Sequence, residues 1–497
     1  MNNKKKKILW IGDDIRMNSG VATAGRQMIL ETAHKFDFFA LAGAITHPEK
    51  VQIFDLSQST NEMAKIKDAS VKLLGVDGYG NEQILMQVIA MEKPDAICFI
   101  TDPRFYSWLW ALEKQIRNTI PLCYWALWDD VPLPRYNRPF YESNDAIFAI
   151  SKQSNNIHKE VLDPQNCCTI NDEEMNGRTL LHYVPHGIDS ECFTSKEKND
   201  AALINFKKNL FGGKDYKFVL LYNSRNVHRK RTSNIILAYR QFVENLPVED
   251  RQKVVLVMHT EIMQDAGTNL LAVKEALCPD YNIIFSPGKL SPNDMCLMYN
   301  CADVTINISS NEGFGLSIAE SIMCGTPVIA SVTGGLQDQI GQTKDDGNPI
   351  EFDADFGSNN VGKYKKHGPW AYPIWPVTRM VQGSIPTPYI FDDITRWEDA
   401  AEGMMYWYLM DTKKREACGA EGRRWAMTEG GFNSKNVGQQ FINGMEYVFA
   451  NWKKPKKFGI YSIKDYVGNT MRDGHMGFEI PPIDKNKLLH EIESLKI

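Results

Sequence analysis

The sequence predicts an α/β protein of two doubly wound domains whose parallel sheets face a common cleft. The chain has 497 residues, which is too many for one ordinary hydrophobic core. In both halves, short apolar runs alternate with segments of helical period, as in βαβ units. A polar, glycine-containing stretch at 194–215 separates the two series. We therefore expect one domain at 1–195 and a second at 196–430.

The N-terminal half begins with an apolar run at 6–14, which predicts a buried first strand. The segment 18–35 follows it and predicts a helix that starts at a glycine turn. Strands are also expected at 95–102 and 120–130, and the segment 145–161 predicts a strand, a serine turn and a helix. This order is typical of a parallel sheet covered by crossover helices.

The C-terminal half repeats the pattern with a second series of elements. Ser291 is placed to cap one of the helices of this series. Strands are expected at 217–226, 252–260, 281–290 and 303–310, and helices at 231–246 and 291–302.

Residues 341–395 interrupt this rhythm. They are rich in proline and aromatic residues and have no helical period. We interpret them as an ordered loop inserted over the second domain, although their composition is equally compatible with local core. Helical segments follow, and the stretch 431–497 is expected to hold a C-terminal helix that packs back towards the N-terminal domain, plus a tail.

Composition argues against several classes of protein. The formal net charge is −5, which gives no overall preference for nucleic acid, and the lysine runs at 4–7 and 453–457 are read as solvated. Ten cysteines without a C-x-x-C pair favour a reduced, cytoplasmic protein without a disulfide framework or zinc site. No apolar run approaches about 18 residues, so we expect a soluble protein or one peripheral to a membrane.

The stretch 309–331 carries the strongest functional signal. A strand ends in a turn with Gly313 and Gly315, and a helix follows directly. Unpaired amides at a helix N-terminus attract anions, and glycines let a ligand approach the main chain. The segment therefore predicts a phosphate cradle, with a simple tight turn as the alternative.

Charged residues near this turn indicate what the phosphate belongs to. Glu312 precedes the helix, and Glu320 lies about two turns further along, on roughly the same face. Carboxylates accept hydrogen bonds from hydroxyls, so the set matches a phosphate flanked by sugars. Arg225 and Lys230 follow a strand of the same domain and could clamp a diphosphate. Taken singly, Glu320 could instead be a surface residue, and the basic loop could simply be solvated.

Two other chemistries fit parts of this pattern. The acidic pairs at 13–14, 129–130 and 392–393 could bind a metal ion, but adjacent carboxylates on strands point in different directions, so we expect no metal site. Glu312 and Glu320 could act as the two carboxylates of a glycoside hydrolase. Hydrolysis of a neutral glycan has no use for a phosphate cradle beside a cationic loop, which argues against that alternative.

The region 184–340 resembles the retaining glycosyltransferases of the GT-B fold, the group that includes glycogen and sucrose synthases and many bacterial mannosyltransferases. The matching motifs occur in the family's order, and two weaker ones lie in the N-terminal half. The motifs are V-P-H-G-I-D at 184–189, Arg225 and Lys230 five apart, G-K-L at 288–290, A-D-V with a serine-bearing strand at 302–310, E-x7-E from Glu312 to Glu320, and G-T-P-V-I-A-S…G-G at 325–335; the weaker ones are N-S-G at 18–20 and A-I-F-A-I-S-K at 146–152.

This resemblance implies a GT-B fold with two Rossmann-like domains. It also implies transfer of a sugar from a nucleoside diphosphate, UDP or GDP most of all, to an acceptor hydroxyl, with retention of configuration and without a cofactor or metal. Glu320 would hold the ribose. By the same resemblance the catalytic residues would be Arg225, Lys230, Glu312 and Asp129, and the donor would contact Gly20, Gly288, Leu290, Gly313, Phe314, Gly315, Leu316 and Glu320.

The acceptor side departs from the family's pattern. Many members have His-Asp after a strand where this chain has Trp128 and Asp129, so either Asp129 takes over a polar contact or the sugar is held differently. Arg104, Trp128 and Asp129 lie at predicted strand ends that face the cleft, where we expect the acceptor. Aromatic residues there could stack on sugars or be core.

The sequence leaves the acceptor open between classes. A glycan or lipid-linked sugar, with peripheral membrane contact, is the first expectation, and a modified base in DNA is the second. The non-enzymatic alternative is a nucleotide-sugar-binding protein without turnover.

Overall fold

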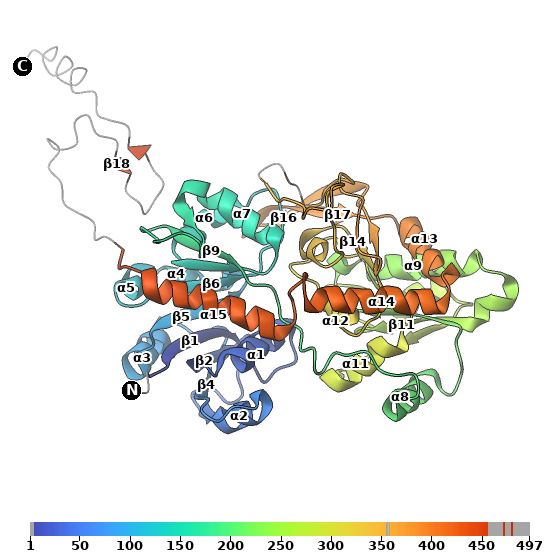
Figure 1. Cartoon of the computed structure of the whole chain (residues 1–497), viewed down its shortest axis with the longest axis horizontal. Coiled ribbons are helices and arrows are strands. Elements are labelled where there is room, and N and C mark those ends of the chain that lie inside the picture. Colours follow the sequence, from blue (N-terminus) through green and yellow to red (C-terminus); the bar gives the residue numbers. More distant parts are fainter. Residues whose placement is uncertain (1–3, 354–355, 357, 456–470, 473–478, 481–497) are drawn as a thin grey trace, which may run out of the picture.

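The structure is a computed structural model of the chain that describes residues 4–353, 356, 358–455, 471–472 and 479–480. Figure 1 shows two α/β domains side by side, each with a central sheet and covering helices. The predicted fold class of two doubly wound α/β units is confirmed.

The N-terminal domain has a nine-stranded sheet in the order β3-β4-β2-β1-β5-β6-β7-β9-β8. Neighbouring strands run parallel, except that β3 is antiparallel to β4. The strands are β1 (Lys6–Asp13), β2 (Phe36–Gly43), β3 (Ile53–Asp55), β4 (Val71–Gly75), β5 (Ala96–Thr101), β6 (Leu122–Ala126), β7 (Ala146–Ala149), β8 (Cys167–Cys168) and β9 (Thr179–Tyr183). The helices are α1 (Gly20–Thr32), α2 (Ser57–Ala64), α3 (Glu82–Glu92), α4 (Ser107–Trp110), α5 (Glu113–Arg117), α6 (Arg138–Glu142) and α7 (Lys152–Leu162).

The C-terminal domain has a six-stranded, fully parallel sheet in the order β12-β11-β10-β13-β14-β15. The strands are β10 (Phe218–Asn223), β11 (Val254–His259), β12 (Ile283–Phe285), β13 (Val304–Asn307), β14 (Val328–Ser331) and β15 (Ala371–Ile374). The helices are α8 (Ala201–Phe211), α9 (Thr232–Glu244), α10 (Leu270–Leu277), α11 (Pro292–Cys301), α12 (Leu316–Met323), α13 (Trp397–Leu409) and α14 (Thr412–Met427).

Helices cover both faces of these sheets, which explains why the central strands are continuously apolar. In β1, for example, the residues from Ile8 to Ile11 are at most 1% exposed. Several helices begin at side-chain caps that satisfy a free amide. The predicted cap at Ser291 is confirmed, since its Oγ accepts a hydrogen bond from the amide of Asp294 at 3.1 Å.

From residue 371 on, the stretch 341–395 forms strands rather than the single inserted loop that the sequence predicts. β15 pairs in parallel with β14 and so belongs to the C-terminal sheet. Trp370, just before it, is buried against Trp425, so this aromatic residue is local core. An antiparallel hairpin then follows, made of β16 (Thr378–Ser384) and β17 (Thr387–Ile394).

This hairpin, β16–β17, links the two domains (Figure 1). The amide of Phe391 donates to the carbonyl of Val131 at 2.7 Å, and Tyr136 Oη donates to the carbonyl of Tyr389 at 3.1 Å. The rings of Tyr136 and Tyr389 also meet edge to face. A segment of the C-terminal domain therefore packs on the loop that follows β6 of the N-terminal domain.

Helix α15 (Ser434–Asn451) follows the C-terminal domain in sequence but packs on the N-terminal sheet (Figure 1). Its Phe441 lies among Trp10, Phe36 and Phe148, with ring centroids 5.3–6.4 Å apart. Two short strands, β18 (Met471–Arg472) and β19 (Glu479–Ile480), pair further along the chain.

The chain passes between the domains twice, and the two crossings pair with each other. The amide of Ile188 donates to the carbonyl of Phe432, and the amide of Ser434 donates to the carbonyl of Ile188, both at 2.9 Å. The ten cysteines are all free. Within the described residues, no helix is both long and apolar enough to cross a bilayer.

Candidate functional site

The glycine-rich turn between β13 and α12 lies at the domain interface. Gly315 caps α12 with φ +92°, a left-handed conformation that glycine adopts without strain. A Cβ on Gly313 would lie 2.7 Å from Ile150 Cδ1 and 3.8 Å from Asp129 Oδ2, both in the N-terminal domain. The start of α12 thus faces the partner domain at very short range.

A second glycine pair, Gly334 and Gly335, packs against the main chain of this turn. The amide of Gly335 donates to the carbonyl of Glu312 at 2.8 Å. A Cβ on Gly335 would lie 2.2 Å from the carbonyl oxygen of Gly313, so two stretches of main chain are in contact. Any larger residue would move the turn, which explains the two adjacent glycines in the motif at 325–335.

Lys230 and Glu312 form a buried ion pair beside the turn. Glu312 Oε1 also accepts hydrogen bonds from Asn307 Nδ2 at 2.9 Å and from Ser309 Oγ at 3.2 Å. The other oxygen, Oε2, lies 3.8 Å from Arg229 Nη1. One carboxylate oxygen is therefore saturated by the protein, while the other faces a single, distant cation.

Burial and charge act against each other in this pair. Burial favours the neutral form of Glu312, but the charges of Lys230 and Arg229 lower its pKa to about 2. Burial lowers the pKa of Lys230 to about 8, although the negative charge of Glu312 opposes this change by stabilising the protonated form. Glu312 is consequently a fixed anion, and Lys230 is a cation held close to its titration range.

Arg225 and Arg229 lie in the same basic loop but have different surroundings. Arg225 is exposed, and its side chain makes no hydrogen bond or ion pair with any described residue. Arg229 instead donates to the carbonyl of Asn311 at 2.6 Å and faces Glu312. Arg229 lies in the basic run at 228–231, directly before Lys230, and this run is the only signal for it in the sequence.

Asp129 brings an N-terminal carboxylate to the same place. Burial raises its pKa to about 6, while Arg229 pulls in the opposite direction and Glu312 adds to the rise. Its neighbour Trp128 is 6% exposed and donates from Nε1 to the carbonyl of Asp130 at 2.8 Å. The indole therefore packs in the N-terminal core and shapes the loop that carries Asp129.

Gly20 meets the start of α12 from the opposite side of the interface. A Cβ on Gly20 would lie 3.3 Å from Leu316 Cδ1. Ser19 caps α1 by accepting from the amide of Ala22, and its hydroxyl donates to Asp13 Oδ2 at 2.5 Å. The N-termini of α1 and α12 therefore lie on two sides of one interdomain site.

Phe314, Gly288 and Leu290 are three further residues predicted to contact the donor. Phe314 is buried edge-on against His186 and Phe432 at the domain crossings. Gly288 is exposed with φ +100°, and Leu290 is half-buried at the end of the same loop. The amides around Phe314 thus have a rigid support, whereas the loop at 288–290 is open.

Glu320 is half-buried and forms no hydrogen bond or ion pair with Lys230 or Glu312. Its Oε2 accepts a hydrogen bond from Tyr299 Oη at 2.7 Å. Burial raises the pKa of Glu320 to about 7, and the Tyr299 hydroxyl opposes that rise. The carboxyl thus changes charge close to neutral pH.

Asp102, Asp392 and Asp393 are held by protein donors. Arg104 is exposed and forms an ion pair with Asp102, with Nη2 and Oδ2 2.7 Å apart. On the β16–β17 hairpin, Asp392 accepts from Arg231 Nη2 at 3.1 Å, and Asp393 accepts from Thr333 Oγ1 at 2.8 Å. The hairpin therefore braces the loops that carry the glycine turn and the cationic run.

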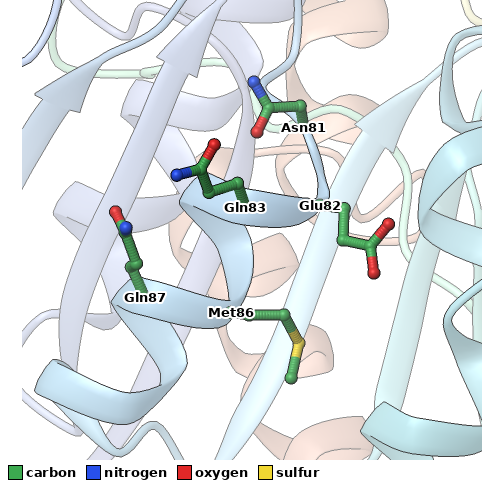
Figure 2. Close-up of a pocket in the computed structure, with 5 residues that line it drawn as sticks. All are labelled: Asn81, Glu82, Gln83, Met86 and Gln87. Atoms are coloured by element: carbon green, nitrogen blue, oxygen red, sulfur yellow. The ribbon is translucent and has the colours of Figure 1, made fainter.

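A surface hollow lies elsewhere, at the start of α3 (Figure 2). It is lined by Asn81, Glu82, Gln83, Met86 and Gln87, none of which belongs to the interdomain site. Met86 and Gln87 are exposed side chains on one helix, so we do not regard this hollow as a candidate functional site.

Comparison with known proteins agrees with this geometry. The family described as "Glycosyl transferases group 1" matches residues 204–355, which include Arg225, Lys230, the glycine turn and both glutamates. This match covers less than half of the chain, so the C-terminal domain is similar to group 1 glycosyltransferases over these residues. The predicted family resemblance is thereby confirmed.

Curated relatives of the group 1 domain are similar over part of their length. A D-inositol 3-phosphate glycosyltransferase from Xylanimonas cellulosilytica is 26% identical over 246 residues, which are 48% of this chain and 53% of that protein. An alpha-monoglucosyldiacylglycerol synthase from Streptococcus pneumoniae is 31% identical over 147 residues, which are 30% of this chain and 31% of that protein. The chain thus spans about half of the first relative's length and less than a third of the second's.

Solved structures match nearly the whole chain. HepE from Anabaena, in complex with UDP and glucose, has a TM-score of 0.59 at 14% identity over 89% of this chain and 99% of its own. Sucrose-phosphate synthase from Thermosynechococcus elongatus has a TM-score of 0.61 at 14% identity over 90% of this chain and 100% of its own. These similarities show that the two domains together have the GT-B fold.

Proposed function

We propose that this protein transfers a sugar from a nucleoside diphosphate to an acceptor hydroxyl, with retention of configuration and without a metal ion. The observation that carries the proposal is the buried Lys230–Glu312 pair beside the start of α12, directly opposite Gly20 and Asp129. The relatives named as glycosyltransferases support the activity, and the neighbours in complex with UDP and UDP-glucose support a UDP-sugar as donor.

The donor diphosphate would lie against the amides of Gly313–Leu316, within reach of Lys230. An ammonium group has three N–H donors, and only one of those on Lys230 is used by Glu312. As the bond to the sugar breaks, charge develops on the departing phosphate, and these preorganised amides and cations would stabilise it. Because the cations belong to the protein, we propose that the reaction needs no metal.

The open oxygen of Glu312 would contact the transferred sugar. Its Oε1 is saturated by Lys230, Asn307 and Ser309, so Oε2 is the atom left for a sugar hydroxyl. Asp129 reaches the same region from the N-terminal domain. With its pKa raised to about 6, it would be largely ionised at neutral pH and could accept a hydrogen bond from donor or acceptor.

For the acceptor we propose a lipid-linked or free sugar or polyol, bound on the N-terminal side near Arg104 and Asp129. The relative named for a glucosyldiacylglycerol and the relative named for inositol phosphate support hydroxyl acceptors of this class. A modified base in DNA remains the second candidate, and steep weakening of acceptor binding by salt would favour it.

Donor consumption tests the proposal. The purified chain is incubated with UDP-glucose or GDP-mannose, with and without EDTA, and release of nucleoside diphosphate is measured. We expect slow release without acceptor, unchanged by EDTA and abolished in Lys230→Ala. A protein that binds a nucleotide sugar, with a raised melting temperature, but never releases nucleotide would instead be a binding protein without turnover.

A further inference from the structure

Two hydrogen bonds in series connect the central sheet of the C-terminal domain to Glu320. Asn223 is the last residue of β10, Tyr299 lies in α11, and Glu320 lies in α12. Asn223 Nδ2 donates to Tyr299 Oη at 2.7 Å, and Tyr299 Oη donates to Glu320 Oε2 at 2.7 Å. Tyr299 is completely buried, so both bonds are sheltered from water.

The direction of each bond follows from the chemistry of its groups. An amide nitrogen can donate but not accept, so Tyr299 Oη must accept from Asn223. The only proton of the phenol is then left for Glu320, which is held as an acceptor at Oε2. Within the described part of the chain, the other oxygen, Oε1, has no hydrogen-bond partner, so it is available to a ligand.

No cation compensates Glu320 within the described residues. The titratable groups that face it are Tyr299 from α11, Cys192 from the crossing between the domains and Cys324 from α12 itself. The cations that act on these cysteines are Lys196 and Arg423 of α14. Arg423 donates to main-chain carbonyls, and neither cation forms an ion pair with Glu320 among the described residues. Among the residues that the structure describes, the Tyr299 hydroxyl is therefore the one donor that stabilises the ionised form of Glu320.

We propose that Asn223 and Tyr299 are positioning residues for the donor nucleotide: they keep Glu320 an acceptor and aim its free oxygen at the vicinal hydroxyls of a ribose. This inference rests on the proposed function. It follows that the site prefers ribonucleotides over 2′-deoxyribonucleotides, since a deoxyribose offers only one of the two hydroxyls.

The test uses the full chain, with UDP, GDP and 2′-deoxy-UDP as nucleotide probes and inorganic pyrophosphate as a probe without ribose. Affinities are measured by calorimetry from pH 5.5 to pH 8.5. In the wild type, nucleotide affinity should rise with pH as Glu320 ionises. In Tyr299→Phe, UDP or GDP should bind about tenfold more weakly at pH 7, because a hydrogen bond to a charged group is lost. The pH of half-maximal affinity should also move upward, while pyrophosphate binding should not change.

Asn223→Asp separates polarity from packing. The variant is nearly isosteric, but its carboxylate would accept the Tyr299 proton and turn the series of bonds around. It should reproduce the upward shift in the pH profile, which a purely steric role of Asn223 would not do. Tyr239→Phe is the matched control: this tyrosine of the same domain is equally buried but donates to the carbonyl of Val254 at 3.1 Å, and its loss should leave nucleotide binding unchanged.

The outcomes separate this inference from the proposed function. If the wild type binds UDP or GDP, and Tyr299→Phe and Asn223→Asp bind it with the same affinity and pH profile, the positioning role is wrong and the proposed function stands. Equal affinity of the wild type for UDP and 2′-deoxy-UDP would also contradict it. If the wild type binds none of the nucleotides and no pyrophosphate, the proposed function falls, and this inference with it.

Discussion

At the scale of single residues, the site depends on charges that are buried together. Lys230 and Glu312 have side chains that are 7% and 9% exposed, so each has lost most of its hydration. Such a pair contributes little net stability, but the removal of one partner leaves the other uncompensated. By our proposal, the same property would strengthen the action of the pair on a bound donor, because water does not screen buried charges.

We expect Lys230→Met to lower the free energy of unfolding by about 3 kcal/mol, since Glu312 is left buried without its main cation. The double variant Lys230→Met/Glu312→Leu should recover most of that loss, while donor consumption stays absent in both. Urea unfolding and nucleotide release measure the two effects. A double variant that is no more stable than Lys230→Met would show that the charge of Glu312 is not the cause.

Glu320 should lower stability at high pH. Its pKa is raised from 4.5 to about 7, so the folded protein disfavours the ionised form. The cost is absent below about pH 4.5 and complete above about pH 7. Because the side chain is only half-buried, we expect Glu320→Gln to stabilise the protein by on the order of 1–2 kcal/mol at pH 8 and by nothing at pH 4.5. Unfolding curves at both pH values test this, and a gain that did not depend on pH would contradict the titration.

At the scale of elements, the glycine turn and α12 work as one unit. The helix begins at Gly315 in a left-handed conformation, and the turn before it is held against Gly335 and the N-terminal domain. Free amides at a helix N-terminus are useful to an anion only if the chain before the helix leaves room for it. The glycines therefore determine where the helix points as well as how closely a ligand approaches.

Gly315→Ala tests this element. A Cβ there would lie 2.5 Å from Leu336 Cδ2 and would adopt φ +92°, so we expect a loss of about 2–3 kcal/mol and weaker pyrophosphate binding. Gly212→Ala is the matched control, because Gly212 has φ +60° at the end of α8 with no atom within 4 Å. It should cost about 1 kcal/mol and leave pyrophosphate binding unchanged. If the two variants lost the same stability and bound pyrophosphate equally well, the contact of position 315 with Leu336 would not matter, and this prediction would be wrong.

At the scale of the whole molecule, two segments from the C-terminal half complete the N-terminal half. Helix α15 covers the N-terminal sheet, and the β16–β17 hairpin joins the loop after β6. The same hairpin carries Asp392 and Asp393 into the loops around the glycine turn. The relative position of the two domains is thus determined by segments that are distant in sequence.

Phe441→Ala should destabilise the N-terminal domain although the residue lies near the C-terminal end of the described chain. Its ring packs against Trp10, Phe36 and Phe148, and the loss of a buried phenylalanine costs about 3–5 kcal/mol. Hydrogen exchange should increase in β1 and β7 more than in β10 and β13. Phe449→Ala, on the same helix but only half-buried, is the control and should have a smaller effect.

The sequence by itself determined the fold class and the order of the C-terminal motifs. Buried parallel strands must be apolar, and a glycine turn before a helix is a local pattern, so both features can be read from short stretches of chain. Spacing also singled out Lys230 and Glu312, which the structure places in contact.

Only the tertiary structure decided which cation faces Glu312, which residue donates a hydrogen bond to Glu320, and how residues 341–395 fold. Arg225 and Arg229 are chemically identical, and their exposure depends on elements far along the chain. The proline- and aromatic-rich stretch gained a sheet strand because β14 offered it an open edge. Burial and hydrogen-bond partners, and with them the pKa of each acid, are properties of non-local packing, which local sequence patterns do not contain.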